Sequence, residues 1–521
     1  MTEKNKKKNE EKSPTEEMAS FCKKKGFVFP SSEIYGGFAG FFDFGPLGSE
    51  LFKNIKDSFW KFFVRSRDNV VGIEASIISH PRTWIASGHV ATFGDMVLVC
   101  SKCKSKYRAD HFIEENLFIK SESLSAEDIH ALIKKHKLRC PKCRGNFEDI
   151  SKFNLLFTTQ VGPIEDSSQK SYLRGETAQA MFMDFKLVAE TARMKLPFGI
   201  AQIGRCFRNE ISPRDFLFRS REFTIGEIEF FVHPDKEKEK SAALESKHLN
   251  LKISFLSSEE QEKGSSKNNE ISSNETTIKQ MLKENRLSEW HAYWLAEQIL
   301  WLEYIGLSKK NLRVREHIKT ELSHYASATF DIEYNFPFGF KEIAGNANRG
   351  QYDLTQHSNE SKNNLQIFDE EEKKNVTPKV IEPTFGIERV FMAALFESFD
   401  DDKKRGNIVL HLSPKIAPNQ IAVFPLVNKD KIPELSQDLF NNLSSEFVCF
   451  YDKSGSIGRR YARQDEIGTP YCLTVDFDSL KNKDVTIRDR DSTNQIRVKI
   501  KNLKETLRSL LSGEVVLKDL K

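Results

Sequence analysis

The chain of 521 residues has little that would send it to a membrane or along a secretory route. No apolar run approaches a length of about 20 residues, which a helix needs to span a bilayer. Residues 1–18 mix lysines with glutamates and lack an apolar core, so they fit neither a secretory signal nor a mitochondrial presequence. We therefore expect a solvated, disordered tail over residues 1–18, no membrane contact and a cytoplasmic location.

A strong net charge is also missing. The formal charge is only +4, because 79 Lys and Arg nearly balance 75 Asp and Glu. Such a chain has no overall field that would hold a polyanion, so a nucleic-acid surface must be a local patch. The length predicts about three to four domains with ample core.

Cysteine is sparse, and half of it forms two CxxC pairs, Cys100 with Cys103 and Cys140 with Cys143. The other four are scattered: Cys22, Cys206, Cys449 and Cys472. Without a secretion signal, this pattern favours a reducing compartment and metal binding over disulfides. Two such pairs can close one tetrahedral four-thiolate site, so we expect a structural Zn²⁺. The alternative is a degenerate knuckle that binds no metal.

Five glycines stand among phenylalanines between residues 27 and 48, ahead of a helix that we expect to start near Ser49. Their spacing fits neither the P-loop nor the dinucleotide-binding pattern, so tight turns and close packing explain them better than phosphate binding. The helix should bury one stripe, made of Leu51, Ile55, Phe59 and Phe62.

Two alternating stretches in the middle of the chain predict a pair of antiparallel strands joined by a charged loop. The first begins at Ile200 and leads to Arg208 and Glu210. The second puts one set of side chains on one face: Arg221, Phe223, Ile225, Glu227 and Glu229. If the two strands turn these faces into one cleft, the cleft holds guanidinium groups, an aromatic ring and carboxylates. Guanidinium groups bind phosphates bidentately and an aromatic ring can stack on a base, so such a cleft suits a nucleotide triphosphate and a small ammonium-bearing partner.

These residues resemble a known motif. Arg208-x-Glu210, a loop, and then Arg219-x-x-x-Phe223 are similar to motif 2 of class II aminoacyl-tRNA synthetases. Residues 382–389, Glu-Pro-Thr-Phe-Gly-Ile-Glu-Arg, lead into an apolar helix and resemble motif 3. Two matches in the right order and context make chance an unconvincing explanation.

Further segments narrow the resemblance to glycyl-tRNA synthetases of the homodimeric class II type. Residues 40–48 resemble the motif 1 region, whose helix packs at the subunit interface in that family. Residues 173–179, Leu-Arg-Gly-Glu-Thr-Ala-Gln, resemble the glycine-binding segment. The resemblance implies a homodimer that activates glycine with ATP to glycyl-adenylate and transfers glycine to the 3′ end of tRNA(Gly).

The resemblance also implies an α+β fold, with an antiparallel-sheet catalytic domain of the class II type. Our expected boundaries are a catalytic domain over residues 19–416 and a C-terminal α/β anticodon-binding domain over 417–521. The catalytic domain should contain a zinc-knuckle-like insertion at 99–149, with a helix near residues 126–137. It should also contain a low-complexity insert at 248–277 and a polar insert at 358–379.

In activation, a carboxylate attacks the α-phosphorus of ATP in line, and the protein supplies fixed positive charge and orientation. By the resemblance, Arg208 and Arg389 are the catalytic residues: Arg208 holds the α-phosphate and the incoming carboxylate, while Arg389 clamps the phosphates from the other side. Arg219 reaches the γ-phosphate and Phe223 stacks on adenine. Glu342 is the expected ATP and Mg²⁺ contact. The full set of expected ATP-binding residues is Arg208, Asn209, Glu210, Phe218, Arg219, Ser220, Arg221, Glu222, Phe223, Glu342, Ile343, Gly386, Ile387, Glu388 and Arg389.

A glycine pocket must bind an ammonium group and must fill the space that the methyl group of a larger amino acid would occupy. Excess carboxylate suits the ammonium, and Glu176, Glu227 and Glu382 are the candidates. A steric wall suits the second task, because missing contacts alone discriminate one methylene by only ~1–3 kcal/mol. Thr384 stands where many relatives have serine and keeps the hydroxyl. The full set of expected substrate-binding residues is Arg108, Glu176, Phe223, Thr224, Ile225, Gly226, Glu227, Glu382, Pro383, Thr384, Phe385 and Gly386.

The C-terminal segment carries five arginines that we expect to form an RNA-binding face: Arg459, Arg460, Arg463, Arg488 and Arg490. For each of them a solvated surface role is the alternative.

Two other functions stay open at this point. A class IIa synthetase for threonine, proline or histidine is disfavoured by the Leu-Arg-Gly-Glu-Thr block and the acidic pocket. A binding protein that has lost catalysis is disfavoured because Arg208, Arg219 and Arg389 are all present.

Overall fold

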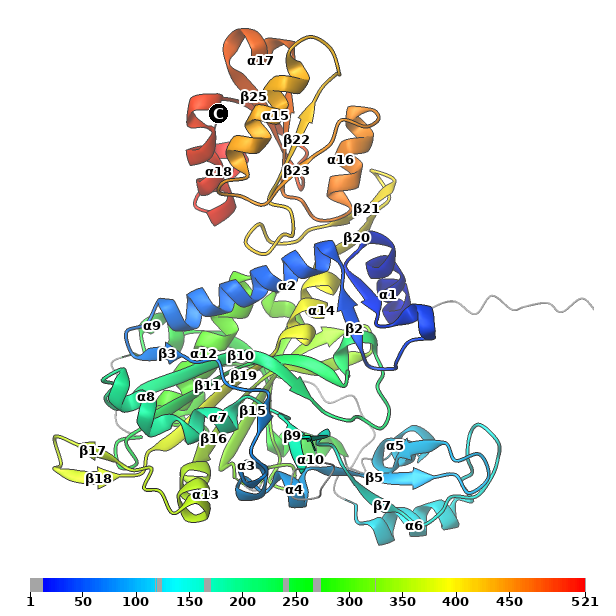
Figure 1. Ribbon diagram of the computed structural model, residues 1–521, viewed down its shortest axis with the longest axis vertical. Coiled ribbons are helices and arrows are strands. Elements are labelled where there is room, and N and C mark those ends of the chain that lie inside the picture. Colours follow the sequence, from blue (N-terminus) through cyan, green and yellow to red (C-terminus); the bar gives the residue numbers. More distant parts are fainter. Residues whose placement is uncertain are drawn as a thin grey trace, which may run out of the picture. The chain divides into compact units, whose positions relative to one another are not determined.

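The computed structural model describes residues 13–117, 119, 124–163, 170–237, 243–265, 273–323 and 325–520 (Figure 1). The chain divides into two compact units. The first contains the chain up to Asn54, residues 215–218 and the chain from Ala394 onward. The second contains residues 55–214 and 219–393, and it holds the predicted site except for Phe218.

The second unit is built on a sheet of nine strands in the order β13-β12-β14-β15-β16-β19-β11-β10-β3. Neighbouring strands are antiparallel, apart from the parallel pairs β3–β10 and β12–β14. This confirms the predicted antiparallel-sheet α+β fold. The strands are β3 (Val70–Gly72), β10 (Phe198–Phe207), β11 (Glu222–Val232), β12 (Lys252–Leu256), β13 (Asn274–Thr277), β14 (Leu312–Glu316), β15 (Ala328–Phe336), β16 (Gly339–Gly350) and β19 (Lys379–Gly386).

The predicted pair of strands is β10 and β11, in a register that joins Cys206 to Phe223 and Gly199 to Phe230. Alternation gives β11 two different faces. On one face Phe230 packs against Trp294, with ring centroids 5.1 Å apart, and Gly226 approaches Phe59. This face is covered by α12 (Glu289–Tyr304) and by the last turns of α2 (Pro46–Phe59). The other face carries Glu227 and Glu229.

Short helices cover the face that carries these carboxyl groups. Phe182, Phe185 and Phe231 form an aromatic core there with the ends of β10 and β11. The helices and small strands around it are β4 (Ile78–Ser79), α3 (Pro81–Ala86), α4 (His89–Thr92), β8 (Thr158–Gln160), β9 (Lys170–Leu173), α7 (Ala178–Met183), α8 (Phe185–Thr191) and α13 (Tyr352–Ser361).

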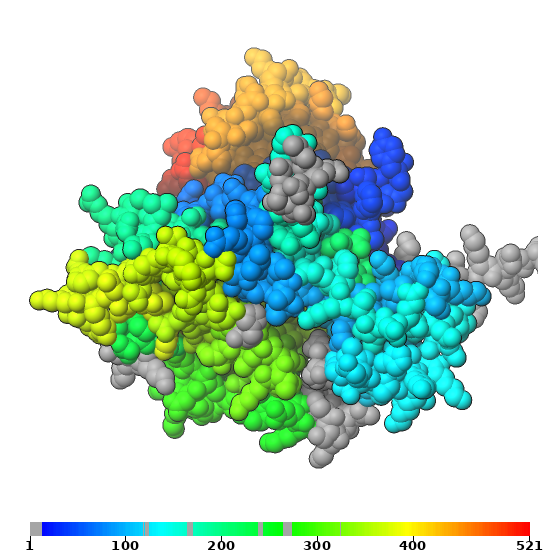
Figure 2. Space-filling model, turned by 60° about the horizontal axis from the view of Figure 1, so that its bottom comes forward, coloured from blue at the N-terminus to red at the C-terminus, as the bar shows by residue number. Residues whose placement is uncertain are grey.

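The four-cysteine insertion forms a small module with its own core. Its strands β5 (Gly94–Val99), β6 (Lys106–Arg108) and β7 (Ser151–Asn154) make one sheet, and α5 (Ala109–Leu117) and α6 (Ala126–Lys135) pack beside it. The helix predicted near residues 126–137 is therefore confirmed. The module is drawn in cyan in Figure 2.

The segments that we expected to be a low-complexity insert and a polar insert contribute helices and strands to the fold. Within residues 248–277, α9 (Ser246–Leu249) and α10 (Ser258–Ser265) flank β12, and β12 pairs with β13 at the edge of the sheet. The low-complexity interpretation is therefore wrong for these parts, and residues 266–272 lie outside the described residues. Ile253 and Phe255 are buried, which explains why a strand forms next to a polar run.

The polar insert at 358–379 is likewise structured. It completes α13 and then forms a hairpin of β17 (Ile367–Asp369) and β18 (Lys374–Val376), drawn in yellow in Figure 2. Leu365 and Val376 are buried and fix the hairpin, so two apolar residues outweigh the polar composition. Along the chain, α11 (Ile278–Lys283) and α12 follow β13.

The first unit begins with α1 (Pro14–Lys25), a helix capped by Ser13 and Glu16 in a capping box. The predicted tail is therefore wrong for residues 14–18, because Met18 is buried on this helix; residues 1–12 lie outside the described residues. Gly48, in the predicted motif 1 region, meets the carbonyl of Phe27 so closely that a Cβ would lie 1.8 Å from its oxygen. Close packing thus explains this glycine, as expected. β1 (Val28–Pro30) and β2 (Phe42–Phe44) pair beside it.

The C-terminal part of this unit is an α/β fold with a five-stranded sheet, which confirms the predicted class of this domain. Its elements are β22 (Ile421–Pro425), α15 (Ile432–Leu443), β23 (Cys449–Tyr451), α16 (Ile457–Asp465), β24 (Tyr471–Val475), α17 (Phe477–Asn482), β25 (Asp484–Asp489), β26 (Gln495–Lys499) and α18 (Leu503–Ser512). The hairpin of β20 (Phe399–Asp402) and β21 (Asn407–Leu410) precedes them, and α14 (Ile387–Ser398) leads from the second unit into the first.

Three of the five arginines predicted for an RNA face are buried in this domain. Arg488 makes two hydrogen bonds to Asp465, at 2.8 and 2.9 Å, and Arg490 donates to the carbonyl of Gly468. Arg460 donates to the carbonyl of Pro425 at 2.6 Å. These three hold the domain together, so the prediction fails for them. Arg459 and Arg463 are exposed on α16.

Candidate active site

Carboxyl groups from four segments converge on the sheet face that α7 covers. This carboxylate niche consists of Glu176, Glu227, Glu229, Glu382 and Asp353 around the guanidinium group of Arg349. All six side chains are buried. The prediction from the sequence that Glu176, Glu227 and Glu382 share a pocket is consistent with this placement, because all three interact electrostatically in the structure.

Glu227 and Thr384 face each other across β11 and β19, whose register pairs them directly. The hydroxyl of Thr384 donates to Glu227 Oε1 at 3.3 Å. The other oxygen, Oε2, accepts the backbone N–H of Thr177 at 2.8 Å and also the hydroxyl of Thr177. Glu227 is thereby fixed at the start of α7.

Glu176 is held by side chains from α4, α7 and β16. Gln179 donates to its Oε1 at 2.8 Å, and His89 Nε2 lies 3.3 Å from its Oε2. Arg349 lies 4.0 Å from Oε1. Burial alone would raise the pKa of Glu176, but these partners, led by His89, lower it below its usual range, so this carboxyl is ionised.

Arg349 is placed by an irregularity in β16. The pairing of β16 with β19 shifts between Asn348 and Gly350, so Arg349 sits in a bulge that aims its side chain at the niche. It binds Asp353 through Nε and Nη2, both at 2.8 Å, and donates to Glu382 Oε1 at 2.8 Å. Its guanidinium also lies 3.9 Å from the ring centroid of Tyr325.

The other carboxyls of the niche hold their protons more tightly than usual. Burial raises the pKa of Glu382 to about 8 despite the attraction of Arg349. Burial and the charge of Glu176 raise the pKa of Glu227, and burial and Glu382 raise the pKa of Glu229 well above its usual value. In the part of the chain that is described, carboxyls outnumber cations here, so the niche gains most from a ligand that brings a positive charge.

A second region contains the predicted arginines Arg208, Arg219 and Arg389. We call this region the arginine cleft. Arg208 donates through Nε to the carbonyl of Gly175 at 3.1 Å, directly before Glu176. Its guanidinium carbon lies 5.3 Å from the ring centroid of Phe223 and 5.2 Å from that of Phe93. Arg208 therefore connects the niche to the ring that we expect to stack on adenine.

Arg219 and Glu210 come from the two sides of the loop between β10 and β11, and Arg219 Nε lies 3.9 Å from Glu210 Oε2. Arg221 donates to the backbone carbonyl of Glu210 at 2.9 Å, which shapes the start of β11. Burial and the neighbouring arginines lower the pKa of Arg219 from its usual value. An anion beside Arg219 would relieve this repulsion.

The four-cysteine module supplies groups to the same cleft. Arg108 is bound by Asp110, with 2.9 Å from Nε to either carboxylate oxygen, and its Nη1 lies 3.4 Å from Asp95. His111 Nε2 lies 3.4 Å from Arg219 Nη1. Burial and Arg108 lower the pKa of His111 to about 3, so it is neutral and can accept this bond. The predicted proximity of Arg108 to the cleft fits this arrangement.

Arg389 stands at the start of α14, where its side chain passes over Gly386; a Cβ there would lie 3.1 Å from Arg389 Cδ. Its Nη1 donates to Glu342 Oε2 at 2.8 Å and to the Glu342 carbonyl at 3.1 Å. Both side chains are partly exposed, so each is accessible to a ligand.

Several predicted side chains do not face the cleft or the niche. Phe385 packs against Phe59 and Trp301, and Gly226 also meets Phe59, on the opposite face of the sheet. Alternation places Pro383 with Phe385 and Thr224 with Gly226, so none of these four residues presents a side chain to the niche. Their sequence neighbours Thr384, Ile225 and Glu227 occupy the niche side.

The remaining predicted residues have structural surroundings of their own. Buried Glu388 accepts the backbone N–H of Thr224 at 2.7 Å, and burial raises its pKa to about 7. Glu222 lies 3.4 Å from Arg205, and Asn209 donates its N–H to the carbonyl of Leu155. The others are Ser220, Ile343 and Ile387, which are buried, and Phe218, which lies in the first unit at the end of the 3-10 turn Phe216–Phe218.

The four cysteines of the module gather their sulfurs within 4.8 Å of one another. Cys100 Sγ lies 3.4 Å from Cys143 Sγ, and Cys103 Sγ lies 3.7 Å from Cys140 Sγ. A tetrahedral zinc with bonds of about 2.3 Å needs sulfurs about 3.8 Å apart, so the set fits the ion. The two turns are alike, since Lys104 and Arg144 follow the pairs with left-handed φ angles of 57° and 58°.

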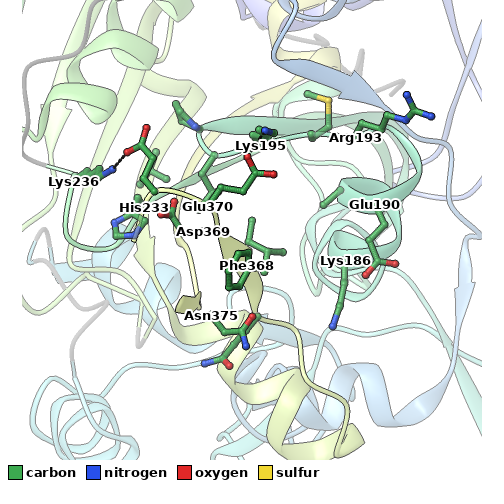
Figure 3. Close-up of a pocket in the computed structure, with 18 of the residues that line it drawn as sticks. Lys186, Glu190, Arg193, Lys195, His233, Lys236, Phe368, Asp369, Glu370 and Asn375 are labelled. Carbon is green, nitrogen blue, oxygen red and sulfur yellow. Dashed lines mark hydrogen bonds and ion pairs between the residues drawn. The ribbon is translucent and has the colours of Figure 1, made fainter. Parts of the chain in front are cut away.

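A pocket of about 780 Å³ opens elsewhere in the second unit, between α8, the end of β11 and the β17–β18 hairpin (Figure 3). Lys186 and Glu190 line it from α8, and Phe368 projects into it from the hairpin. It contains none of the residues predicted for ATP or glycine. Basic and acidic side chains both line it, and Lys195 is bound by Glu370 at 2.6 Å.

Sequence reasoning missed Arg349, Asp353 and His89. Arg349 and Asp353 are four residues apart, which is a signal for an ion pair, but the bulge that aims them inward left no trace in the pattern. Glu229 was visible in the alternation of β11, on the face of Glu227, and was not selected. The spacing of two residues could have identified it.

Comparison with known proteins agrees with this geometry. Residues 159–399 match the family model described as the tRNA synthetase class II core domain (G, H, P, S and T). Residues 420–510 match the model described as the anticodon binding domain. The first match covers the niche, Arg208, Arg219 and Arg389, and the second covers the five-stranded C-terminal fold.

The chain is similar over nearly its whole length to curated proteins. It is 43% identical over 504 residues to the glycine–tRNA ligase of Caldanaerobacter subterraneus subsp. tengcongensis, covering 95% of this chain and 98% of that protein. It is 42% identical over 503 residues to the glycine–tRNA ligase of Acetivibrio thermocellus, with the same coverage. It is 42% identical over 497 residues to that of Ruminiclostridium cellulolyticum, covering 94% of this chain and 96% of that protein.

Proposed function

The chain belongs to the family of glycine–tRNA ligases, and we propose that it joins glycine to the 3′ end of tRNA(Gly) through a glycyl-adenylate, with the carboxylate niche as the glycine site. The observation that carries this proposal is the buried excess of carboxyls around Arg349. An ammonium ion is the natural complement of such a site, and buried ionic groups of one sign are costly without a counter-charge.

In the niche, Glu176, Glu227 and Glu382 bind the ammonium group of glycine. Glu176 is ionised and rigid, because His89 and Gln179 hold it. The hydroxyl of Thr384 orients Glu227 from the neighbouring strand. The niche is closed by packed side chains, so a larger amino acid would meet a wall rather than a missing contact.

In the arginine cleft, ATP lies along Arg208, Arg219 and Arg389, with adenine on Phe223. Arg208 bonds to the backbone directly before Glu176, so one guanidinium can touch both the α-phosphate and the carboxylate that attacks it. This geometry favours an in-line displacement, because it brings the two reactants together and compensates the charge that develops on the phosphate. Arg108 and Glu210 complete the walls.

ATP and Mg²⁺ are the cofactors of the class II family. Glu342 would hold a Mg²⁺ ion, because Mg²⁺ prefers carboxylate oxygens as protein ligands, and the ion would supply positive charge next to the phosphates. In the structure Glu342 is bound to Arg389. Arrival of ATP would let Arg389 turn to phosphate and leave Glu342 for the cation.

The four-cysteine module would hold one structural Zn²⁺ per chain. Its sulfur separations fit a tetrahedral ion, and Arg108 and His111 follow on the same module, so the metal would fix the side chains that border Arg219. Cys140→Ser should lose the metal and lower the thermal midpoint of the second unit, as measured by elemental analysis and calorimetry. A metal-free wild type with full activity would contradict the role.

The domain limits that we propose are a catalytic domain up to about residue 416 and an anticodon-binding domain from 417 onward. The match over residues 420–510 supports the second limit.

We also propose a homodimer through the motif 1 region, because Ile34, Tyr35 and Phe38 are exposed next to it and would be covered by a second copy. The cytoplasm, where tRNA is charged, is the proposed location. No helix in the described part of the chain is long and apolar enough to cross a membrane.

The direct test is aminoacylation of tRNA(Gly) with labelled glycine by the purified chain. We expect ATP-dependent, acid-precipitable label on the tRNA and none on tRNA(Thr) or tRNA(Pro). Labelling of those tRNAs with their own amino acids instead of glycine would refute the assignment.

A further inference from the structure

Glu229 is the member of the niche without an evident task. It lies two residues after Glu227 on β11, so both side chains point to the same face. Its side chain is 0% exposed. Neither carboxyl oxygen has a hydrogen-bond partner anywhere among the described residues.

Its neighbours are other acidic groups. Strands β11 and β19 pair Glu227 with Thr384 and Phe230 with Ile381, so the same register puts Glu229 opposite Glu382. Like charges opposite each other on neighbouring strands destabilise a sheet. The charged groups that act most strongly on Glu229 are Glu382 on β19, Arg349 on β16, Glu227 on β11 and Asp353 on α13.

Arg349 does not satisfy Glu229. Its Nε and Nη2 donate to Asp353 and its Nη1 donates to Glu382, each at 2.8 Å. In the empty niche Glu229 is therefore stable as the neutral acid, and burial raises its pKa accordingly. Keeping a carboxyl buried without a partner is unfavourable for folding, and such groups concentrate at functional sites.

A bound ammonium group would change this balance. The group would lie among Glu176, Glu227 and Glu382, next to Glu229 but not in contact with it, because the oxygens of Glu229 are covered. A positive charge in a buried, weakly screened site lowers the pKa of nearby carboxyls. Glu229 is the carboxyl of the niche whose two oxygens have no hydrogen-bond partner among the described residues, so it can lose its proton without breaking such a bond.

We propose that Glu229 is a positioning residue that carries a proton in the empty niche and releases it to solvent when the ammonium group of glycine binds. This inference rests on the proposed role of the niche as the glycine site. The carboxylate formed on Glu229 then strengthens the field that holds the ammonium group from beneath Glu227 and Glu382. Binding of glycine is thereby coupled to release of a proton.

The experiment measures this coupling on the full chain. Isothermal titration calorimetry of glycine, in buffers with different heats of ionisation at one pH, gives the number of protons released per glycine. Wild type should release roughly one proton. Glu229→Gln, which keeps the shape of the neutral acid, should release markedly fewer and raise KM for glycine about tenfold in pyrophosphate exchange, with KM for ATP unchanged.

Glu333→Gln is the matched control. Glu333 is also a buried carboxyl of the same sheet with a raised pKa, but it is paired with Arg313 at 2.6 Å on the neighbouring strand. This variant should keep the wild-type proton release and KM for glycine. Glu229→Asp, which restores an acid, should recover proton release relative to Glu229→Gln.

The inference is overturned if wild type binds glycine without releasing a proton, a result that needs no variant to fold. It is also overturned if Glu229→Gln releases as many protons as wild type, since the proton would then come from Glu382. A wild type that shows no response to glycine at all would instead refute the proposed function.

Discussion

Two of the buried charged clusters in this molecule, one in the C-terminal domain and one in the carboxylate niche, differ in how their charges are balanced. In the C-terminal domain, Arg488 is matched to Asp465 by two hydrogen bonds, and Arg490 bonds to Asp491 and to a backbone carbonyl. In the carboxylate niche, Arg349 faces an excess of carboxyls, and the pKa values of Glu227, Glu229 and Glu382 are raised. The paired charges of the C-terminal domain stabilise its fold, whereas the excess of carboxyl groups in the niche is suited to binding a positively charged substrate.

The largest effect should come from the arginine cleft. Arg208→Ala should reduce glycyl-adenylate formation by about 10³-fold or more, because it removes a fixed cation from the phosphate that is attacked. Glycine-dependent pyrophosphate exchange measures the loss. The thermal midpoint should stay close to that of wild type, since Arg208 bonds within the fold to one backbone carbonyl. Near-normal exchange would remove Arg208 from the reaction.

Breaking a paired cluster should affect stability instead. Arg488→Ala leaves Asp465 buried beside fewer partners and should destabilise the C-terminal domain by about 3–5 kcal/mol. Calorimetry of the full chain would detect an earlier transition for this domain. KM for glycine should not change. If the variant were stable and only bound tRNA more weakly, Arg488 would belong to an RNA face after all.

Removing one carboxylate from the niche should weaken glycine binding without unfolding the protein. Glu176→Gln should cost about 1.5–3 kcal/mol in glycine affinity, the usual range for a charge-assisted hydrogen bond. The readout is KM for glycine in pyrophosphate exchange, with KM for ATP as the internal control. Equal increases in both constants would mean that the substitution disturbs the whole site.

The smallest effect is a pH dependence. The pKa of Glu382 is raised to about 8, so below that pH this carboxyl is mostly protonated and attracts an ammonium group less. KM for glycine should therefore fall as the pH rises from 6.5 toward 8, by at most about tenfold per pH unit. A KM that rises over this interval would show that the ionised form of Glu382 does not bind glycine.

The sequence was sufficient for the parts that depend on local pattern. Alternation identified β10 and β11 and the shared face of Glu227 and Glu229, and the four cysteines fell into one cluster as spacing suggested. The apolar stripe of residues 51–62 located α2, and the helix expected near residues 126–137 is α6. Arg208 follows the end of β10 and Arg389 lies in the first turn of α14, where the resemblance put them.

The failures arise where tertiary contacts override local composition. Polar runs concealed β12 and the β17–β18 hairpin, because a few buried residues such as Phe255 and Val376 decide those segments. We predicted that all residues from Glu382 to Gly386 bind the substrate, and this set includes Phe385. Strand alternation instead turns the side chain of Phe385 toward Phe59 and Trp301. Arg349 depends on a bulge, and a bulge cannot be read from residue types.

The central claim is that a niche with excess carboxylate selects glycine next to arginines that bind ATP. Amino-acid-dependent pyrophosphate exchange across all twenty amino acids tests it most directly. The account predicts exchange with glycine and no more than background with alanine, serine, threonine or proline. Exchange that responds to a larger amino acid as strongly as to glycine would contradict it.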